Sequence, residues 1–289
     1  MNRFKSAEHG RWSAERQRGR GDVLLPSSPP PLLPSSCPTR ARRSAAIILA
    51  GGRGTRLGAL YPHLPKPMVP AAGKPFIEWV LRHLASQGLR RAIVSIGHLA
   101  EVIECYLEQR PSGGLEVSSV REPVPLGTAG SARLAAQAAG DVDEFVVANG
   151  DSLVLADLRG GWLLLHRDDV DGVVVGVQVD DAARYGTLDV GSGGRLTGFR
   201  EKRPGRSSNA GSLINAGVYF LKRPLLDALP ADQPLSLETD AFPAWLAGQA
   251  RLYVLPVKGP FLDIGTPESV CEAARFIQEN FDGESFVVS

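Results

Sequence analysis

The chain has 289 residues, of which 43% are hydrophobic, and a formal net charge of +1, so it can bury one sizeable core. Of its 32 Lys/Arg and 31 Asp/Glu, nine basic and three acidic residues lie within residues 1–43, which leaves the remainder mildly acidic. This balance argues against a nucleic-acid-binding protein. Cys37, Cys105 and Cys271 share no metal-ligand spacing, so we expect free thiols rather than a zinc site or a disulfide framework.

Residues 1–43 are rich in Arg, Pro, Ser and Gly and show no periodicity, so we expect a disordered basic tail. A dispensable tail, a docking arm and a transit-like segment all fit this composition. The apolar stretch at residues 23–34 is interrupted by prolines and lacks the core of a signal peptide. No run approaches the roughly 18 apolar residues of a membrane span. We therefore expect a cytoplasmic protein that has no membrane partner.

From residue 44 onward, apolar runs rich in β-branched residues alternate with segments of helical period. The expected strands cover residues 45–50, 91–98, 115–122 and 144–151, and the expected helices cover residues 75–88, 100–110 and 127–140. This alternation predicts an α/β fold with a Rossmann-like, mostly parallel sheet and helices on both of its faces.

The second half of the chain has a different pattern. After an expected strand at residues 172–179, short runs at 185–190, 196–202 and 215–222 leave no room for crossover helices, so we expect added antiparallel strands. A helix at 238–249, a strand at 251–257 and a final helix follow. We expect one domain, residues 44–289, with a nucleotide half at about 44–155 and a substrate half at about 156–289.

The first expected strand leads directly into a loop with four glycines and two arginines, in the stretch AAIILAGGRGTRLG at residues 45–58. A P-loop is excluded because no lysine follows a glycine at the required spacing. The dinucleotide fingerprint fails because Leu57 stands where its third glycine is needed. We interpret the stretch as a loop whose bare backbone N–H groups approach a polyphosphate, and a simple tight turn is the alternative.

Two cations accompany this loop. Arg56 presents a planar fork suited to phosphate oxygens, and Lys66 lies between prolines in the stretch PKPMVP. Both suit the charge that develops during phosphoryl or nucleotidyl transfer, so we expect them to be catalytic. The nucleotide-binding residues expected in the loop are Ala50, Gly51, Gly52, Gly54 and Thr55.

These residues carry a resemblance to a known family. The run LAGGRGTRL followed by PKPMVPAAGKPFIEWVL resembles the signature of the sugar-1-phosphate nucleotidyltransferases, and further motifs match in order: PLGTAGSA, NGDS, RYGTLDV, FREK, NAGVYF and FLDIGTPE. Within the family the chain most resembles D-glycero-α-D-manno-heptose 1-phosphate guanylyltransferases and, more broadly, mannose-1-phosphate guanylyltransferases. The resemblance implies the nucleotide-diphospho-sugar transferase fold and the synthesis of a nucleotide sugar for surface polysaccharides.

A magnesium site is expected beside the loop. Asp151 comes just past the C-terminal end of a buried strand, where ligands bind in open α/β sheets, and a carboxylate buried there needs a cation. Mg²⁺ bound to nucleotide phosphates is the natural partner. The resemblance implies that Asp263, in the stretch FLDIGTP, is the second metal ligand.

The stretch REPVPLGTAG is expected to bind the base. Gly127 leaves room for the ring plane, and Glu122 can accept hydrogen bonds from ring N–H groups. Guanine presents two adjacent donors to a carboxylate, whereas uracil and thymine present one, so we expect GTP to be the nucleotide. A uracil donor could also satisfy Glu122, and an ordinary surface glutamate is the structural alternative.

The sugar-binding residues follow from the resemblance alone: Tyr185, Gly186, Glu201, Lys202 and Asn215. The carboxylate and amide of Glu201 and Asn215 suit hydroxyl groups, while Lys202 suits the sugar phosphate. Adjacent residues point to opposite faces of a strand, so only one of Glu201 and Lys202 faces the pocket unless a bulge intervenes.

The combined hypothesis is that GTP with Mg²⁺ reacts with a sugar 1-phosphate, heptose 1-phosphate first, and releases pyrophosphate. Three alternatives remain: a mannose-1-phosphate guanylyltransferase, a uridylyltransferase acting on a sugar such as N-acetylmuramic acid 1-phosphate, and a non-catalytic nucleotide-sugar sensor. The presence of Arg56, Lys66, Asp151 and Asp263 argues against the sensor. The residues leave the oligomeric state open, a homo-oligomer included.

Overall fold

The computed structural model describes residues 44–54, 57, 60–111, 113–179, 182, 185–200, 212–231 and 233–281. The expected basic tail, residues 1–43, lies outside the described residues. Within the described ranges, no helix is both long enough and apolar enough to cross a membrane. Cys105 and Cys271 are exposed free thiols.

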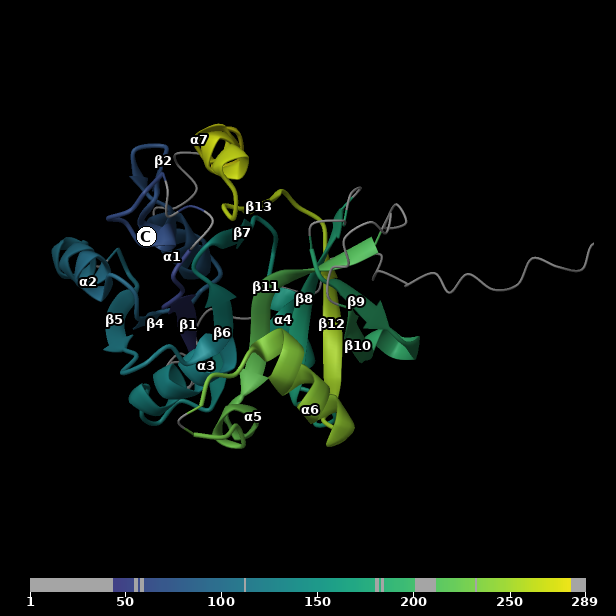
Figure 1. Cartoon of the computed structure of the whole chain (residues 1–289). Coiled ribbons are helices and arrows are strands. Elements are labelled where there is room, and N and C mark those ends of the chain that lie inside the picture. Colours follow the sequence, from purple (N-terminus) through teal and green to yellow (C-terminus); the bar gives the residue numbers. More distant parts are fainter. Residues whose placement is uncertain are drawn as a thin grey trace, which may run out of the picture.

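A nine-stranded sheet forms the centre of the molecule (Figure 1). Its strands are β1 (Ser44–Ala50), β4 (Arg91–Ile96), β5 (Glu116–Arg121), β6 (Glu144–Asn149), β8 (Gly172–Val179), β9 (Thr187–Val190), β10 (Leu196–Arg200), β11 (Ser212–Lys222) and β12 (Leu252–Val257). Strands β6, β1, β4 and β5 pair in parallel, and β8 pairs in parallel with β12. The expected mostly parallel sheet is therefore confirmed.

Strand β11 joins the two parallel groups because it pairs antiparallel with both β6 and β8. The antiparallel pair β9 and β10 attaches to β11 through the register Ile214↔Thr187. These are the antiparallel strands that the short runs predicted. Two small antiparallel sheets were not expected from the sequence: β2 (Pro70–Ala71) with β3 (Lys74–Pro75), and β7 (Ser152–Val154) with β13 (Phe261–Asp263).

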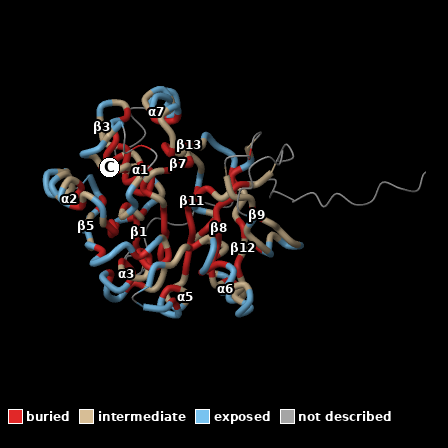
Figure 2. The backbone as a smooth tube through the Cα atoms, in the orientation of Figure 1, coloured by how far each residue is buried: buried red, intermediate tan, exposed pale blue. Residues whose placement is uncertain are grey.

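Helices cover both faces of the sheet, and burial is concentrated in the layer between them and the strands (Figure 2). One face carries α1 (Phe76–Ser86), α2 (Ala100–Gln109), α4 (Arg159–Leu165) and α7 (Pro267–Asn280), and the other carries α3 (Gly127–Ala138), α5 (Arg223–Asp227) and α6 (Phe242–Ala247). Strand β1 serves both cores, because Ile48 packs on the first face and Ile47 on the second.

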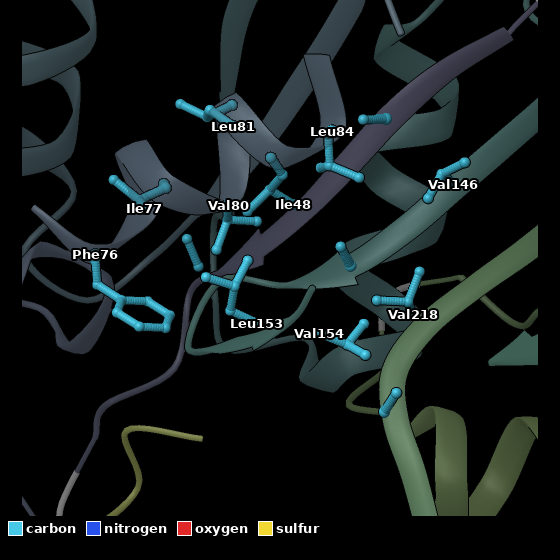
Figure 3. Packing of buried hydrophobic residues seen from close by; sticks show 14 of the residues in the cluster. Ile48, Phe76, Ile77, Val80, Leu81, Leu84, Val146, Leu153, Val154 and Val218 are labelled. Atoms are coloured by element: carbon cyan, nitrogen blue, oxygen red, sulfur yellow. The ribbon is translucent and has the colours of Figure 1, made fainter. Parts of the chain in front are cut away.

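The face of α1 shows why its sequence forms an amphipathic helix. Ile77, Val80, Leu81 and Leu84 recur at helical spacing and pack toward Ile48, as Figure 3 shows. Pro75 precedes the first turn, and Gly88, at φ +92°, follows the last one. The proline and glycine that bounded this helix in the sequence have the expected roles.

The prediction of one regular α-helix at residues 238–249 is wrong. The structure has one π-helical turn at Leu237–Ala241, which continues into α6. Pro243 explains the change, because it has no backbone N–H to donate to the preceding turn. π-Helical turns are rare and frequently occur at functional sites.

His83, in the last turn of α1, makes stability depend on pH. Burial lowers the pKa of His83 from 6.5 to about 4, and its Nε2 atom has no hydrogen-bond partner. The folded protein therefore favours the neutral imidazole, and the associated stability is complete above pH 6.5 and falls as the pH drops toward 4. Relative to His83→Leu, the wild type should lose about 3 kcal/mol of unfolding free energy between about pH 7 and about pH 4. Denaturant unfolding across this range measures the difference, and a pH-independent difference would contradict it.

Candidate active site

A cleft of about 520 Å³ opens at the carboxyl ends of β1 and β6. The pairing Leu49↔Asn149 aligns the ends of these parallel strands, so the loop that follows β1 lies beside the turn that contains Asp151. The Gly150 N–H donates to the carbonyl of Leu49 at 2.9 Å and fixes this contact. Among the described residues, those expected to bind nucleotide or metal that line the cleft are Ala50, Gly51, Gly52, Gly54, Lys66, Glu122, Gly127 and Asp151.

Lys66 bridges the two aspartates that were expected to bind metal. Its Nζ atom lies 2.5 Å from Asp151 Oδ2 and 4.0 Å from Asp263 Oδ1. The aspartates meet because β13 pairs with β7, which places Asp263 opposite Ser152, and because the Ile264 N–H donates to the Asp151 carbonyl at 3.0 Å. Residues far apart in sequence thus form one charged cluster at the edge of the cleft.

The cluster fits Mg²⁺ through the chemistry of its donors. Lys66 neutralises one of the two carboxylate charges, so the group keeps a net charge of −1 that a divalent cation can use. In the described part of the chain, no group of three or more His, Cys, Asp or Glu side chains could hold a metal ion. Two aspartates nonetheless match the usual Mg²⁺ site, in which one or two carboxylates act together with substrate phosphates.

Glu122 is buried, which rules out the surface glutamate that the sequence had left open. Its Oε1 atom accepts hydrogen bonds from the hydroxyls of Ser131 at 2.8 Å and Ser95 at 3.2 Å, and Oε2 accepts from the Leu126 N–H at 3.1 Å. These donors offset the cost of burying the carboxylate and hold it at the wall of the cleft.

The glycine loop approaches other groups closely. A Cβ atom at Gly51 would overlap the Glu122 carboxylate, so glycine lets the loop backbone pass close to that carboxylate. Gly54 adopts φ +56° above Lys66, a backbone conformation that favours glycine. Thr55 and Arg56, the remaining residues expected here, lie outside the described residues.

Gly127 has a structural role that the sequence did not indicate. Its φ is +69°, and a Cβ atom there would lie 2.5 Å from the Leu235 carbonyl oxygen. Backbone hydrogen bonds of 2.8 Å hold this contact, from Ala129 N to Leu235 O and from Leu235 N to Leu126 O. Glycine at this position therefore lets residue 235 support the start of α3, beside the expected base site.

Substitution of Gly127 should destabilise the fold strongly. Gly127→Ala combines the cost of a left-handed alanine with a backbone clash, and we expect it to lower the unfolding free energy by about 3 kcal/mol. Gly140 is a matched control, because it has φ +66° and nothing lies within 4 Å of the position that an added methyl group would take. Gly140→Ala should cost about 1 kcal/mol. Urea unfolding of both variants measures the difference, and equal losses would show that the clash has no effect.

Three of the expected sugar-binding residues are described, Tyr185, Gly186 and Asn215, and none of them lines the cleft. The Tyr185 ring packs edge-on against Phe261, in the strand that carries Asp263, with 5.4 Å between the ring centroids. The Gly186 carbonyl accepts a hydrogen bond from the Asn215 N–H at 3.0 Å. Glu201 and Lys202 lie outside the described residues. That only one of them faces the pocket, unless a bulge intervenes, stays a prediction.

Asn215 takes part in a polar network that sequence reasoning missed. Its Nδ2 atom donates to the Tyr219 hydroxyl at 2.7 Å, and that hydroxyl donates to Glu238 Oε1 at 2.9 Å. Burial, followed by the charge of Glu238, raises the pKa of Tyr219 well above its usual range, so Tyr219 keeps its proton. Glu238 Oε2 also accepts from Thr128 at 3.3 Å, and Thr128 lines the cleft. Glu238 lies in the π-helical turn, but the sequence has no pattern that predicts such a turn or connects this glutamate with Asn215 and Tyr219.

Comparison with known proteins gives a consistent result. The model of the family described as nucleotidyl transferase matches residues 45–280. Mannose-1-phosphate guanylyltransferase of Mycobacterium tuberculosis is 35% identical over 227 residues, which cover 77% of this chain but 61% of the relative. D-glycero-alpha-D-manno-heptose 1-phosphate guanylyltransferase of Aneurinibacillus thermoaerophilus is 31% identical over 233 residues, covering 81% of this chain and 98% of the relative. The chain thus spans less than two thirds of the mycobacterial relative.

Solved structures agree with the sequence comparison. HddC from Yersinia pseudotuberculosis superposes with a TM-score of 0.69 at 32% identity over 80% of this chain and 98% of that one, and one of its structures is complexed with GMP-PN. A glucose-1-phosphate thymidylyltransferase homologue from Bacillus anthracis has a TM-score of 0.71 at 20% identity, which supports the fold alone.

Proposed function

Because the chain belongs to the nucleotidyl transferase family, we propose that it transfers a guanylyl group from GTP to a sugar 1-phosphate and releases pyrophosphate. The observation that carries this proposal is the contact of Lys66 with both Asp151 and Asp263 at the edge of the cleft. Guanylyltransferases at 31% and 35% identity support guanine as the base. The buried Glu122 carboxylate on the cleft wall supports the same choice.

The reaction needs positioning and charge neutralisation more than proton transfer. An oxygen of the sugar phosphate attacks the α-phosphorus of GTP in line, and the bond from that phosphorus to the bridging oxygen of pyrophosphate breaks. The attacking phosphate is already ionised at neutral pH, so no general base is required. The backbone of Gly51 and Gly52 holds the polyphosphate, while Lys66 and Arg56 stabilise its charge.

Asp151 and Asp263 would hold Mg²⁺. When bound, the ion would supply neutralisation of phosphate charge and orientation of the reacting groups. Lys66 contacts these same aspartates, so its ammonium would lie next to phosphates bound at this edge of the cleft. Tyr185 and Asn215 are proposed to position the sugar, together with Glu201 and Lys202.

We place D-glycero-α-D-manno-heptose 1-phosphate first among the sugars. The similarity to the heptose enzyme extends over 98% of that relative, compared with 61% of the mannose enzyme. Pyrophosphate release, assayed with GTP, UTP, dTTP and ATP against heptose, mannose and N-acetylmuramic acid 1-phosphates, tests the proposal. GTP with heptose 1-phosphate should give the highest kcat/KM.

The other outcomes of this assay identify the alternatives. Preference for mannose 1-phosphate would change the sugar and leave the chemistry intact. UTP with N-acetylmuramic acid 1-phosphate would make the protein a uridylyltransferase. No release with any pair, combined with binding of a nucleotide sugar, would identify a sensor.

A further inference from the structure

The Ser131 hydroxyl lies between two hydrogen-bond acceptors at the wall of the cleft. Its Oγ atom is 2.8 Å from Glu122 Oε1 and 2.6 Å from the carbonyl oxygen of Gly127. A serine hydroxyl carries one proton, so it donates to only one of these acceptors at a time. Rotation about the Cβ–Oγ bond transfers that hydrogen bond from one acceptor to the other while every heavy atom stays in place.

The other donors around Glu122 decide what this rotation changes. Oε1 also accepts from Ser95 at 3.2 Å, and Oε2 accepts from the Leu126 N–H at 3.1 Å. A carboxylate offers about four lone-pair positions, two on each oxygen. When Ser131 donates to Glu122, both positions on Oε1 are filled and one position on Oε2 is open. In that state Glu122 can accept one hydrogen bond from a bound base.

A base with two donors needs two free acceptor positions on Glu122, one on each carboxylate oxygen. Guanine presents its N1–H and its 2-amino group side by side, and a carboxylate receives such a pair through both oxygens. The second bond requires the position on Oε1 that Ser131 fills. If the Ser131 proton turns to the Gly127 carbonyl, that position becomes free and the hydroxyl stays hydrogen-bonded.

We propose that Ser131 is a specificity-determining residue whose hydroxyl turns from Glu122 to the Gly127 carbonyl when guanine binds. The inference rests on the guanylyl transfer proposed above. Turning away from a charged oxygen toward a neutral one weakens the hydrogen bond of Ser131, because bonds to ionised acceptors are the stronger kind. Ser131 therefore reduces the advantage that guanine has over a base with a single donor.

The Ser131→Ala variant tests this directly, and alanine suits a position within α3. Inosine triphosphate is the matched probe, because its base keeps N1–H and lacks the 2-amino group. We expect the ratio of kcat/KM for GTP to that for inosine triphosphate to rise about fivefold in Ser131→Ala, since the 2-amino group no longer competes with a hydroxyl.

Ser95→Ala is the matched control. Ser95 also donates to Oε1, but it is fully buried and does not line the cleft, so the acceptor position that it vacates faces the interior. The nucleotide ratio should stay unchanged in this variant. An equal rise in both variants would overturn the proposal, because any loss of a donor to Glu122 would then have the same effect.

An unchanged or lower ratio in Ser131→Ala also overturns the proposal. A lower ratio would mean that the hydroxyl only holds Glu122 in place. These results require a wild type that turns over GTP. If the wild type released pyrophosphate with neither nucleotide, the guanylyl transfer itself, and with it this inference, would be overturned.

Discussion

The Asp151→Asn variant is expected to lose about 1000-fold in kcat for pyrophosphate release while its unfolding free energy changes by less than about 1 kcal/mol. Asparagine keeps the shape of the side chain and removes its charge, so Asp263 would remain the only carboxylate of the pair. The Asp151 side chain is 31% exposed, and its Oδ2 atom contacts Lys66 rather than the core. We therefore attribute the expected loss of kcat to weaker binding of metal and phosphate rather than to a loss of folding. Steady-state rates across a Mg²⁺ titration, together with denaturant unfolding, measure both quantities.

Asp157→Asn is the control for this variant. Asp157 is also partnered by a cation, Arg159 at 2.7 Å, but both of these side chains are more than half exposed. The Asp157→Asn substitution should leave kcat unchanged. Near-normal turnover in Asp151→Asn, or an equal loss in Asp157→Asn, would contradict the assignment of Asp151 as a metal ligand.

The second large effect concerns Lys66. We expect Lys66→Met to lower kcat by about 100-fold, because the reaction loses a fixed positive charge near the phosphates. The same variant should need less Mg²⁺ for half-maximal rate. In the wild type the Lys66 ammonium, 2.5 Å from Asp151 Oδ2, occupies oxygens that Mg²⁺ would use. The opposite directions of the two changes distinguish this role from a general loss of structure.

Lys258→Met is a suitable control, since Lys258 is exposed and does not line the cleft. It should leave both kcat and the Mg²⁺ requirement unchanged. If Lys66→Met required more Mg²⁺ than the wild type, Lys66 would be helping to hold the metal rather than competing with it. That result would contradict competition between the Lys66 ammonium and Mg²⁺ for the same carboxylate oxygens.

The parts of the fold that follow a strict period could be predicted from sequence. Strand β1 is a continuous apolar run, helix α1 repeats apolar residues at helical spacing, and Pro75 and Gly88 mark the ends of α1. The antiparallel pair of β7 with β13 could not be predicted in this way. Each of its strands has three residues, which is too short for a period to show, and its pairing depends on tertiary packing.

The sequence predicted some residues of the candidate site better than others. Asp151 follows a buried strand, so its place at the carboxyl edge of the sheet followed from the apolar run before it. Asp263 was expected only from resemblance, because the strand pairing that brings it to Lys66 leaves no pattern in the sequence. The burial of Glu122 depends on Ser95 and Ser131, two hydroxyls from different elements that no local pattern connects to it.

The network of Asn215, Tyr219 and Glu238 could not be predicted for a related reason. Asn215 and Tyr219 lie in β11 on either side of Gly217, where the register with β8 shifts and Gly217 adopts φ +71°. That irregularity brings both side chains to one hydrogen bond, whereas regular alternation alone describes only which residues share a face. Bulges of this kind depend on contacts between strands.

Transfer of labelled phosphorus is the most direct test of guanylyl transfer from GTP to a sugar 1-phosphate. GTP labelled at its α-phosphorus is incubated with Mg²⁺, unlabelled heptose 1-phosphate and the wild-type protein, and the products are separated. We expect the label to appear in a GDP-sugar and unlabelled pyrophosphate to form in equal amount. Label recovered only in GMP, or only in unreacted GTP while the protein binds the nucleotide, would contradict nucleotidyl transfer at the cluster of Lys66, Asp151 and Asp263.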